Sequence, residues 1–367
     1  MKVLHVAGAR PNFMKVAPTL RALADRGARN VLVHTGQHYD TAMSAAFFDD
    51  LGLPEPDVHL EVGSGSHAAQ TAKVMERIEP VLAEERPDLT VVVGDVNSTL
   101  AASIVCAKLR LRLAHVEAGL RSFDRAMPEE INRVLTDQLS DLLFITSPEA
   151  EENLKREGAT GAIHFVGNPM IDSLERHLDK ARGSTVLERL GLEPERYALV
   201  TLHRPSNVDD PATLAGILEA LSSVAASVPV LFPAHPRTVK MMRTHELERF
   251  VSLDAAVAKP GVVTCIEPVG YVDFLRLMSD ARVVLTDSGG IQEETTILGV
   301  PCLTIRHNTE RPITVTMGTN KLVGTDPAAI RREAVVAIEG PRPAPARPPL
   351  WDGKAGERIA EVILDGR

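Results

Sequence analysis

The chain has few cysteines and no pattern of clustered metal ligands. Its 367 residues include three cysteines, Cys106, Cys265 and Cys302, which are far apart and form no Cys-x-x-Cys pair. Structural zinc sites usually need clustered cysteine or histidine ligands, so we expect no metal site. Cysteines at this spacing are typical of thiols in a reducing compartment, and we expect the protein to be cytoplasmic.

Long apolar runs and a basic excess are also missing. No run of about 18 apolar residues occurs, and Met1 and Lys2 lead directly into VLHVA without the pattern of an export signal. The formal net charge is −9, whereas a nucleic-acid-binding surface usually appears as a basic excess. We therefore expect neither a membrane nor a nucleic-acid partner, although individual basic residues can still hold a phosphate group.

Short runs rich in Val, Ile and Leu alternate with helix-compatible stretches along both halves of the chain. This alternation predicts parallel sheets covered by helices, and the length exceeds that of a single hydrophobic core. The predicted strands are 3–7, 31–35, 89–95, 113–117, 142–146 and 163–167 in the first half, and 197–202, 228–234, 262–268, 282–287 and 301–306 in the second. The predicted fold class is α/β, with two doubly wound parallel-sheet domains.

We place the domain boundary after Asn168, because Pro169 cannot continue a strand ladder. The first domain then covers residues 1–168 and the second covers 169–340. The proline-rich sequence PRPAPARPP falls in 341–353 and predicts an extended connector. The remaining residues, about 354–367, read as one more helix.

Candidate functional residues follow the predicted strands of the first half. Ligands of open parallel sheets bind outside the carboxyl ends of the strands. Arg10 in GARPNFMK stands beside a helix N-terminus, where anions bind readily. Asp95 and Glu117 end neighbouring strands, and MPEEINR puts Glu129 and Glu130 in the first turn of a helix. Helix entry and dipole compensation are the structural alternatives, but grouped carboxylates are also poised for proton transfer.

Histidine and arginine follow two strands of the second half. His203 and Arg204 lie in TLHRPSN, and His235 and Arg237 lie in PAHPRT. A single histidine after a strand is more often structural than catalytic. The repetition of a histidine and an arginine after two strands favours a role in phosphate binding or proton transfer.

The most specific local pattern is LTDSGGIQEE, which predicts a strand, a tight turn and a helix. Backbone amides of Ser288, Gly289 and Gly290 at the helix N-terminus can cradle a pyrophosphate, and Glu294 can reach ribose hydroxyls. A second glycine motif, GSGSHA (63–68), matches the dinucleotide pattern but follows a weak strand and not the first one. We interpret it as an ordinary helix-entry loop and expect no nicotinamide cofactor.

Taken together, these motifs resemble those of the non-hydrolysing UDP-N-acetylglucosamine 2-epimerases. The resemblance covers nearly the whole chain and runs in order through GARPNFMK, GQHYD, VVVGDVNSTLA, HVEAGLRS, PEEINR, TLHRPSN, DSGGIQEE and TERPITVTMGTNKLVGTD. It implies a GT-B-like fold, with two Rossmann-like domains facing each other across a central cleft. It also implies that the C-terminal helix returns to the first domain, and that the enzyme is a homodimer that needs no cofactor.

The resemblance implies reversible interconversion of UDP-N-acetylglucosamine and UDP-N-acetylmannosamine. The hydrogen on carbon 2 of the sugar is not next to a carbonyl group, so it cannot be removed as an enolate proton. Elimination of UDP to 2-acetamidoglucal, followed by re-addition, avoids this difficulty. In the family, the carboxylates that match Asp95, Glu117 and Glu129 transfer protons, and the histidine that matches His203 is essential.

The resemblance also implies a set of substrate-binding residues. Arg10 and the Ser-Gly-Gly turn would hold the pyrophosphate, Glu294 the ribose, and the region 271–274 the uracil. The full set is Arg10, Lys15, His235, Phe274, Ser288, Gly289, Gly290 and Glu294. Alternatives that stay open are a 2-epimerase of a modified UDP-sugar such as a diacetamido uronic acid, a GT-B glycosyltransferase, a hydrolysing relative and a UDP-sugar sensor.

One departure from the family predicts a change in regulation. Family members that their own substrate activates commonly read HRRE where this chain reads HRPS, so Pro205 replaces an arginine of the regulatory substrate site. We predict that the rate depends hyperbolically on UDP-N-acetylglucosamine, because the regulatory site lacks this cation. A sigmoidal rate curve, or a reverse reaction that depends strongly on added UDP-N-acetylglucosamine, contradicts the prediction.

Overall fold

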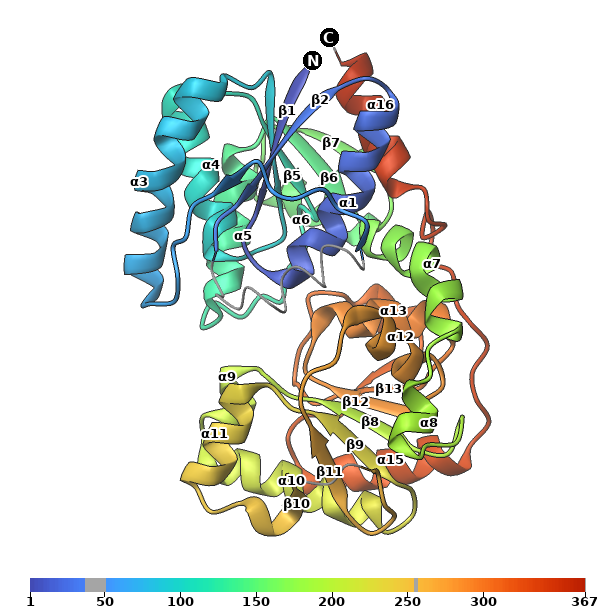
Figure 1. Ribbon diagram of the computed structural model, residues 1–367. Helices are drawn as coiled ribbons and strands as arrows, with labels where there is room; N and C mark the ends of the chain where they lie inside the picture. Colours follow the sequence, from blue (N-terminus) through green and yellow to red (C-terminus); the bar gives the residue numbers. More distant parts are fainter. Residues whose placement is uncertain (37–50, 254–256, 367) are drawn as a thin grey trace. The chain divides into compact units, whose positions relative to one another are not determined.

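The computed structural model describes residues 1–36, 51–253 and 257–366, which form two compact units (Figure 1). Unit 1 contains Met1–Arg176 and Pro349–Arg367, and unit 2 contains His177–Pro348. The division falls inside helix α7 (Pro169–Arg182), and the boundary that we expected after Asn168 lies at the start of that helix. Most of the GQHYD motif lies outside the described residues.

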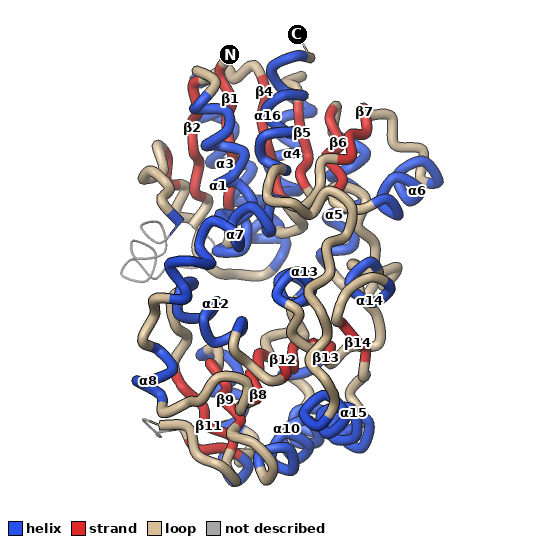
Figure 2. Tube along the Cα trace, turned by 90° about the vertical axis from the view of Figure 1, so that its right-hand side faces the viewer, coloured by secondary structure: helices blue, strands red, loops and turns tan. Residues whose placement is uncertain are grey.

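Unit 1 is built on a seven-stranded sheet in the order β3-β2-β1-β4-β5-β6-β7, in which all neighbouring strands are parallel. Figure 2 shows the strands from β2 to β7. Its strands are β1 (Lys2–Ala7), β2 (Arg29–His34), β3 (Val58–His59), β4 (Leu89–Val93), β5 (Leu113–Val116), β6 (Leu142–Ile145) and β7 (Ala162–Phe165). Every residue of β4 and β5 is buried, as expected for central strands of a sheet that helices cover on both faces.

Unit 2 repeats this architecture with the order β10-β11-β9-β8-β12-β13-β14, again parallel throughout. Its strands are β8 (Ala198–Thr201), β9 (Val230–Pro233), β10 (Val251–Ser252), β11 (Val263–Ile266), β12 (Val283–Thr286), β13 (Cys302–Thr304) and β14 (Asn320–Leu322). The sequence analysis missed β3, β10 and β14. All three are edge strands of two or three residues, too short to show a periodic pattern.

Helices connect the strands, and many of them begin with proline directly after a strand end. Proline suits the first helical turn because its fixed φ and missing N–H cost nothing there. Besides α7, the helices of unit 1 are α1 (Arg10–Asp25), α3 (His67–Glu85), α4 (Asn97–Leu109), α5 (Pro128–Leu139), α6 (Pro148–Arg156) and α16 (Ala355–Asp365). Those of unit 2 are α8 (Val186–Leu190), α9 (Pro205–Val208), α10 (Pro211–Ala225), α11 (Pro236–Thr244), α12 (Tyr271–Ser279), α13 (Gly289–Leu298), α14 (Ile313–Thr316) and α15 (Pro327–Glu339).

Each unit has an apolar core of its own between its sheet and its helices. The core therefore fixes the strands, and the residues that follow them sit on a rigid support. Within the described part of the chain, no helix combines the length and apolar character that crossing a membrane requires.

The C-terminal segment completes unit 1. Trp351 is buried, and its indole N–H donates to the carbonyl oxygen of Thr146 at 2.8 Å. The carboxylate of Asp172 accepts hydrogen bonds from the backbone N–H groups of Ala355 and Gly356, which begin helix α16. Helix α16 then lies beside α1 (Figure 1).

The contact between these two helices depends on a glycine. A Cβ atom at Gly356 would lie 2.6 Å from the backbone carbonyl carbon of Pro18. The backbone of a helix is rigid, so it cannot move aside to relieve this clash. We predict that Gly356→Ala lowers the free energy of unfolding of unit 1 by about 1–3 kcal/mol, because overpacking outweighs the better helix propensity of alanine. Trp351 is the single tryptophan of the chain, so its fluorescence during urea unfolding reports on this unit.

Gly65→Ala is the matched control, because a Cβ atom there would lie 3.9 Å from its nearest neighbour, the Cβ atom of Ala69. Its unfolding curve should match that of the original protein. If Gly356→Ala is as stable as Gly65→Ala, α16 does not pack against α1 as closely as the structure shows.

Candidate functional site

Two carboxylates of unit 1 follow adjacent strands. Asp95 comes after β4, and Glu117 comes directly after β5, which pairs with β4. Glu117 has a φ of +69°, a left-handed conformation that non-glycine residues rarely adopt, and its side chain is only 2% exposed. This strained backbone turns a buried carboxylate toward the end of the sheet where ligands bind.

Lys15 lies against Glu117. The sequence analysis expected Lys15 to bind substrate, and the structure places its ammonium group in an ion pair with Oε2 of Glu117, with both side chains buried. A Cβ atom at Gly94 would lie 3.5 Å from Oε2 of Glu117 and 3.6 Å from Nζ of Lys15. The backbone just before Asp95 therefore adjoins this ion pair.

Helix α5 is tied to Asp95. The Nε and Nη2 atoms of Arg133 donate to Oδ2 of Asp95 at 3.1 and 2.6 Å, and the side chain of Asn132 donates to the Asp95 carbonyl oxygen at 2.8 Å. The side chain of Asp95 remains 27% exposed. These contacts bring the first turn of α5, which carries Glu129, to the end of β4.

Glu129 and Glu130 have different environments. Glu130 is buried and accepts hydrogen bonds from the backbone N–H groups of Ser122 and Phe123 and from the Ser122 hydroxyl, at 2.9–3.0 Å. It also pairs with Arg133 at 2.6 Å. Glu129 is partly exposed and, among the described residues, has no hydrogen bond or ion pair. Glu130 therefore holds the loop before α5, whereas Glu129 remains partly exposed at the start of the helix.

A buried histidine joins the segments that carry these carboxylates. Nε2 of His115 donates to the carbonyl oxygen of Gly94 at 2.8 Å, and its Nδ1 lies 2.6 Å from Oδ1 of Asp137 on α5. Oδ2 of Asp137 accepts from the backbone N–H of Gly119 at 3.1 Å and from Arg121 at 2.7 Å. Burial alone would raise the pKa of Asp137, but its partners His115 and Arg121 outweigh this and lower it. The pair thus links the ends of β4 and β5 to α5.

In unit 2, His203 follows β8 and pairs with a buried carboxylate. Nδ1 of His203 lies 2.9 Å from Oδ1 of Asp287, and the His203 side chain is 52% exposed while that of Asp287 is fully buried. Asp287 also accepts from the backbone N–H groups of His203 and Arg204 and from the side chain of Asn207, at 2.9–3.2 Å. Burial favours a raised pKa for Asp287, but these hydrogen bonds and the nearby His203 lower it.

The Ser-Gly-Gly turn begins helix α13 as the sequence predicts. Ser288 is the N-cap residue, and its backbone N–H donates to the Thr286 hydroxyl at 2.9 Å. A Cβ atom at Gly289 would lie only 2.4 Å from Nη1 of Arg311 and 2.8 Å from Oε1 of Glu310. Gly289 is therefore required for the close approach of a guanidinium group to the helix start, and Gly290 follows in the same first turn.

Three arginines and two glutamates surround this helix start. Arg306 and Arg204 contact Glu310 at 2.8 and 3.2 Å, and Arg311 contacts Glu310 at 2.8 Å and Glu293 at 2.7 Å. Both glutamates are fully buried, so the group has one positive charge in excess next to a helix N-terminus. Such an arrangement favours a bound anion such as a pyrophosphate.

Glu294 lies on α13, one turn after the glycines, and is buried. The Tyr271 hydroxyl donates to its Oε1 at 2.8 Å. Burial raises the pKa of Glu294 to about 8; the hydrogen bond from Tyr271 opposes this rise, and Glu293 adds to it. Glu294 is therefore largely protonated at neutral pH and can donate to a hydroxyl group as well as accept from one. Phe274 is partly buried on the first turn of α12, three residues after Tyr271.

Two further residues, His235 and Arg10, were also expected to bind substrate. His235 is exposed and caps α11, where its Nδ1 accepts from the backbone N–H of Arg237 at 3.2 Å. Arg237 in turn pairs with Asp209 at 2.5 Å. Arg10 begins α1, as predicted, but its side chain lies outside the described residues.

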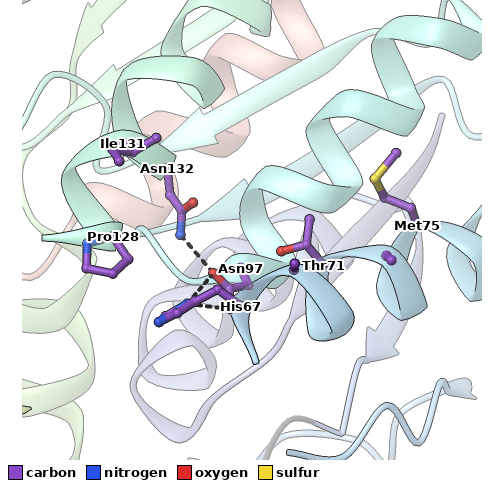
Figure 3. Close-up of a pocket in the computed structure, with 9 residues that line it drawn as sticks. His67, Thr71, Met75, Asn97, Pro128, Ile131 and Asn132 are labelled. Atoms are coloured by element: carbon purple, nitrogen blue, oxygen red, sulfur yellow. Dashed lines mark hydrogen bonds between the residues drawn. The ribbon is translucent and has the colours of Figure 1, made fainter. Parts of the chain in front are cut away.

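A hollow of about 420 Å³ opens in unit 1 between α3 and α5 (Figure 3). At its polar end the side chain of Asn132 donates to Asn97, which also contacts His67. Because Asn132 also binds the Asp95 carbonyl, the hollow adjoins the carboxylate group. The GSGSHA loop leads into α3, and Ser66 caps that helix by accepting from the Ala69 N–H, as we expected of a helix-entry loop.

Sequence reasoning missed several residues of these clusters. Asp137 and Asp287 were given no role because their partners are far away along the chain. Arg306 and Arg311 lie in or just before the TERPITVTMGTNKLVGTD motif, which was noted without a role for its arginines. Across the described ranges, no three His, Cys, Asp or Glu side chains are grouped as a metal site needs.

Comparison with known proteins gives full-length matches. A model of the family described as UDP-N-acetylglucosamine 2-epimerase matches residues 21–364. The chain is 41% identical to the UDP-N-acetylglucosamine 2-epimerase of Methanocaldococcus jannaschii over 373 residues, which covers 100% of both proteins. It is 39% identical to the UDP-2,3-diacetamido-2,3-dideoxy-D-glucuronate 2-epimerase of Pseudomonas aeruginosa over 368 residues, 99% of each protein.

The match extends to a solved structure. A crystal structure of the M. jannaschii UDP-GlcNAc 2-epimerase in complex with UDP-GlcNAc and UDP has a TM-score of 0.92 at 41% identity, over 100% of both chains. Together with the two parallel sheets described above, this likeness confirms the fold class predicted from the sequence.

The contrast between the two neighbouring glutamates generates a prediction about stability. Glu130→Gln should lower the free energy of unfolding of unit 1 by about 3 kcal/mol, because it removes a buried carboxylate that is paired with Arg133. Glu129→Gln is the matched control and should unfold like the original protein. Urea unfolding followed by Trp351 fluorescence measures both, and equal stabilities of the two variants would contradict the structural role of Glu130.

Proposed function

Because the chain belongs to the UDP-N-acetylglucosamine 2-epimerase family, we propose that it inverts carbon 2 of UDP-N-acetylglucosamine and gives UDP-N-acetylmannosamine. It is thus an isomerase that acts on a nucleotide sugar. The observation that carries the proposal is the group of three carboxylates, Asp95, Glu117 and Glu129, at adjoining strand and helix ends of unit 1. Lys15, Arg133 and the His115–Asp137 pair hold their positions.

The proposed reaction begins with elimination. One carboxylate removes the proton from carbon 2, the bond from carbon 1 to the pyrophosphate oxygen breaks, and a double bond forms between carbons 1 and 2. The products are UDP and 2-acetamidoglucal. In the second step a protonated carboxylate delivers a proton to the opposite face of carbon 2, and the UDP oxygen bonds again to carbon 1. Side chains that remove and deliver a proton must approach opposite faces, which suits carboxylates on separate elements.

Unit 2 supplies the groups that bind UDP in this proposal. The excess positive charge of Arg204, Arg306 and Arg311 and the N-terminus of α13 stabilise the pyrophosphate as it leaves. Ser288, Gly289 and Gly290 provide backbone N–H groups, and Arg10 of unit 1 adds a further cation. Glu294 binds the ribose hydroxyls.

The remaining substrate contacts follow the family resemblance. Phe274 contacts the uracil, and Lys15 acts on the substrate through its ion pair with Glu117. His235 stays a proposed phosphate contact. We also carry forward the expectations that the enzyme is a cytoplasmic homodimer and that the reaction needs neither a metal ion nor a cofactor.

A second substrate has a specific observation in its favour. The 2-epimerase of UDP-2,3-diacetamido-2,3-dideoxy-D-glucuronate is 39% identical to this chain over the full length, close to the 41% of the first relative. The two substrates differ at positions 3 and 6 of the sugar and share carbon 2 and the UDP group. The same residues of unit 1 and unit 2 would serve either substrate.

Proton NMR of the purified protein with UDP-N-acetylglucosamine in deuterium oxide tests the proposal. We expect deuterium at carbon 2 and formation of UDP-N-acetylmannosamine, without added metal, cofactor or acceptor. A parallel sample contains the diacetamido uronic acid substrate. Turnover of this second sugar alone would replace the proposed substrate, and no turnover of either would overturn the epimerase assignment.

Variants complete the test. Asp95→Asn, Glu117→Gln and Glu129→Gln should each lower kcat by about 10²- to 10⁴-fold, the range expected for loss of a general acid or base. Glu151→Gln on α6 is the matched control, because this glutamate only pairs with Lys155 at the surface. Full activity of all three site variants would show that these carboxylates do not transfer the proton.

A further inference from the structure

We propose that Asp287 is a positioning residue that holds His203 with its Nδ1–H on the buried carboxylate and its Nε2 toward the diphosphate of the substrate. The inference rests on the proposed function for the identity of the ligand. It gives a role to the last residue of the predicted strand 282–287, which directly precedes the glycine turn.

The contact with Asp287 holds the edge of the His203 ring that carries Nδ1. Nδ1 lies 2.9 Å from Oδ1 of Asp287, and the backbone N–H of His203 donates to the same carboxylate. A carboxylate that is ionised can only accept, so Nδ1 carries the proton in this pair. The other ring nitrogen, Nε2, is then the one that can face a ligand, in keeping with the half-exposed side chain.

The position of Asp287 in the chain places its partners beside the start of α13. Asp287 directly follows β12 and precedes Ser288, the N-cap of α13. The same carboxylate accepts from the N–H of Arg204, whose guanidinium group belongs to the arginine cluster at the start of α13. One buried side chain therefore fixes both His203 and Arg204 beside the helix N-terminus that would receive the diphosphate.

Hydrogen-bonding capacity explains why a carboxylate is needed at this position. Both oxygens of the Asp287 carboxylate accept, so it receives the Nδ1–H of His203 together with the backbone N–H groups of His203 and Arg204. Asparagine at position 287 has one accepting oxygen and an NH₂ group that cannot accept, so it would not hold the His203 ring and both backbone N–H groups in the same way. Loss of the carboxylate should then weaken diphosphate binding through His203 and leave the nucleoside contacts unchanged.

A double-mutant cycle on the full-length chain tests this with UDP and uridine as the probes. Titration calorimetry gives the Kd of each probe for the original protein, His203→Asn, Asp287→Asn and the double variant. Each single change should weaken UDP binding by about tenfold or more, the loss expected for a charge-assisted hydrogen bond. The double variant should bind UDP within about threefold of the weaker single variant, since coupled residues are not additive.

Binding of uridine distinguishes a positioning role of Asp287 from a general structural role. Its Kd should stay within about twofold in all four proteins, because it lacks the diphosphate that His203 contacts. Asn207→Ala is the control, since it removes another contact of Asp287 and leaves the His203 pair in place. This control should bind UDP within about threefold of the original protein.

Three results would overturn the proposal: losses that multiply in the double variant, equal losses for uridine and UDP, or a loss in Asn207→Ala as large as in Asp287→Asn. Because the probes bind without turnover, these outcomes are independent of whether the chain epimerises a given sugar. If Asp287→Asn does not fold, long-range ¹H–¹⁵N correlations in the original protein decide instead. They should show a proton on Nδ1 of His203, and a proton on Nε2 alone would contradict the proposal.

Discussion

The buried pair of His115 and Asp137 is the contact on which the arrangement of unit 1 depends. It joins the carbonyl of Gly94 at the end of β4, the loop that follows Glu117, and helix α5 through one set of hydrogen bonds. Replacing such a buried polar pair with apolar residues is often neutral or favourable for stability, so its presence suggests another purpose. Here it joins the three segments that carry Asp95, Glu117 and Glu129, the carboxylates of the proposed reaction, for which proton transfer would require a fixed spacing.

Unit 2 also contains a buried carboxylate that joins separate segments by hydrogen bonds. The buried carboxylate of Asp287 joins the end of β8 to the end of β12, as Asp137 joins α5 to the end of β5. At both places the loop that follows a strand is held by hydrogen bonds from its backbone N–H groups to the buried carboxylate. A buried anion that accepts several backbone N–H groups supplies this rigidity, because an unmade hydrogen bond in the interior is costly. The two sheets therefore present functional side chains on loops that behave as part of the core.

The sequence was sufficient to predict the fold class and to place Asp95 and Glu117 at strand ends, because both follow from where apolar runs end. Asp95 and Glu117 stand directly after central strands, and the Ser-Gly-Gly turn has a clear signal of its own. The roles of Glu129 and Glu130 could not be separated, since both occupy the first turn of α5 and only burial against Ser122 and Arg133 distinguishes them. Asp137, Asp287 and Arg311 were missed for a related reason. Apart from the contact of Arg311 with the adjacent Glu310, their partners named above lie 16 or more residues away, and a single sequence contains no signal for such pairs.

The charge balance of unit 2 depends on Glu294. Arg204, Arg306 and Arg311 exceed Glu310 and Glu293 by one positive charge, and an ionised Glu294 on the same helix would cancel that excess. Burial raises the pKa of Glu294 to about 8, so at neutral pH the side chain is mostly uncharged and the start of α13 remains positive. The same protonated carboxyl group can both donate to and accept from the hydroxyls of a ribose. In the proposed function, burial of Glu294 therefore serves two parts of UDP: it avoids a further negative charge near the proposed diphosphate site, and it gives the ribose a partner for both kinds of hydrogen bond.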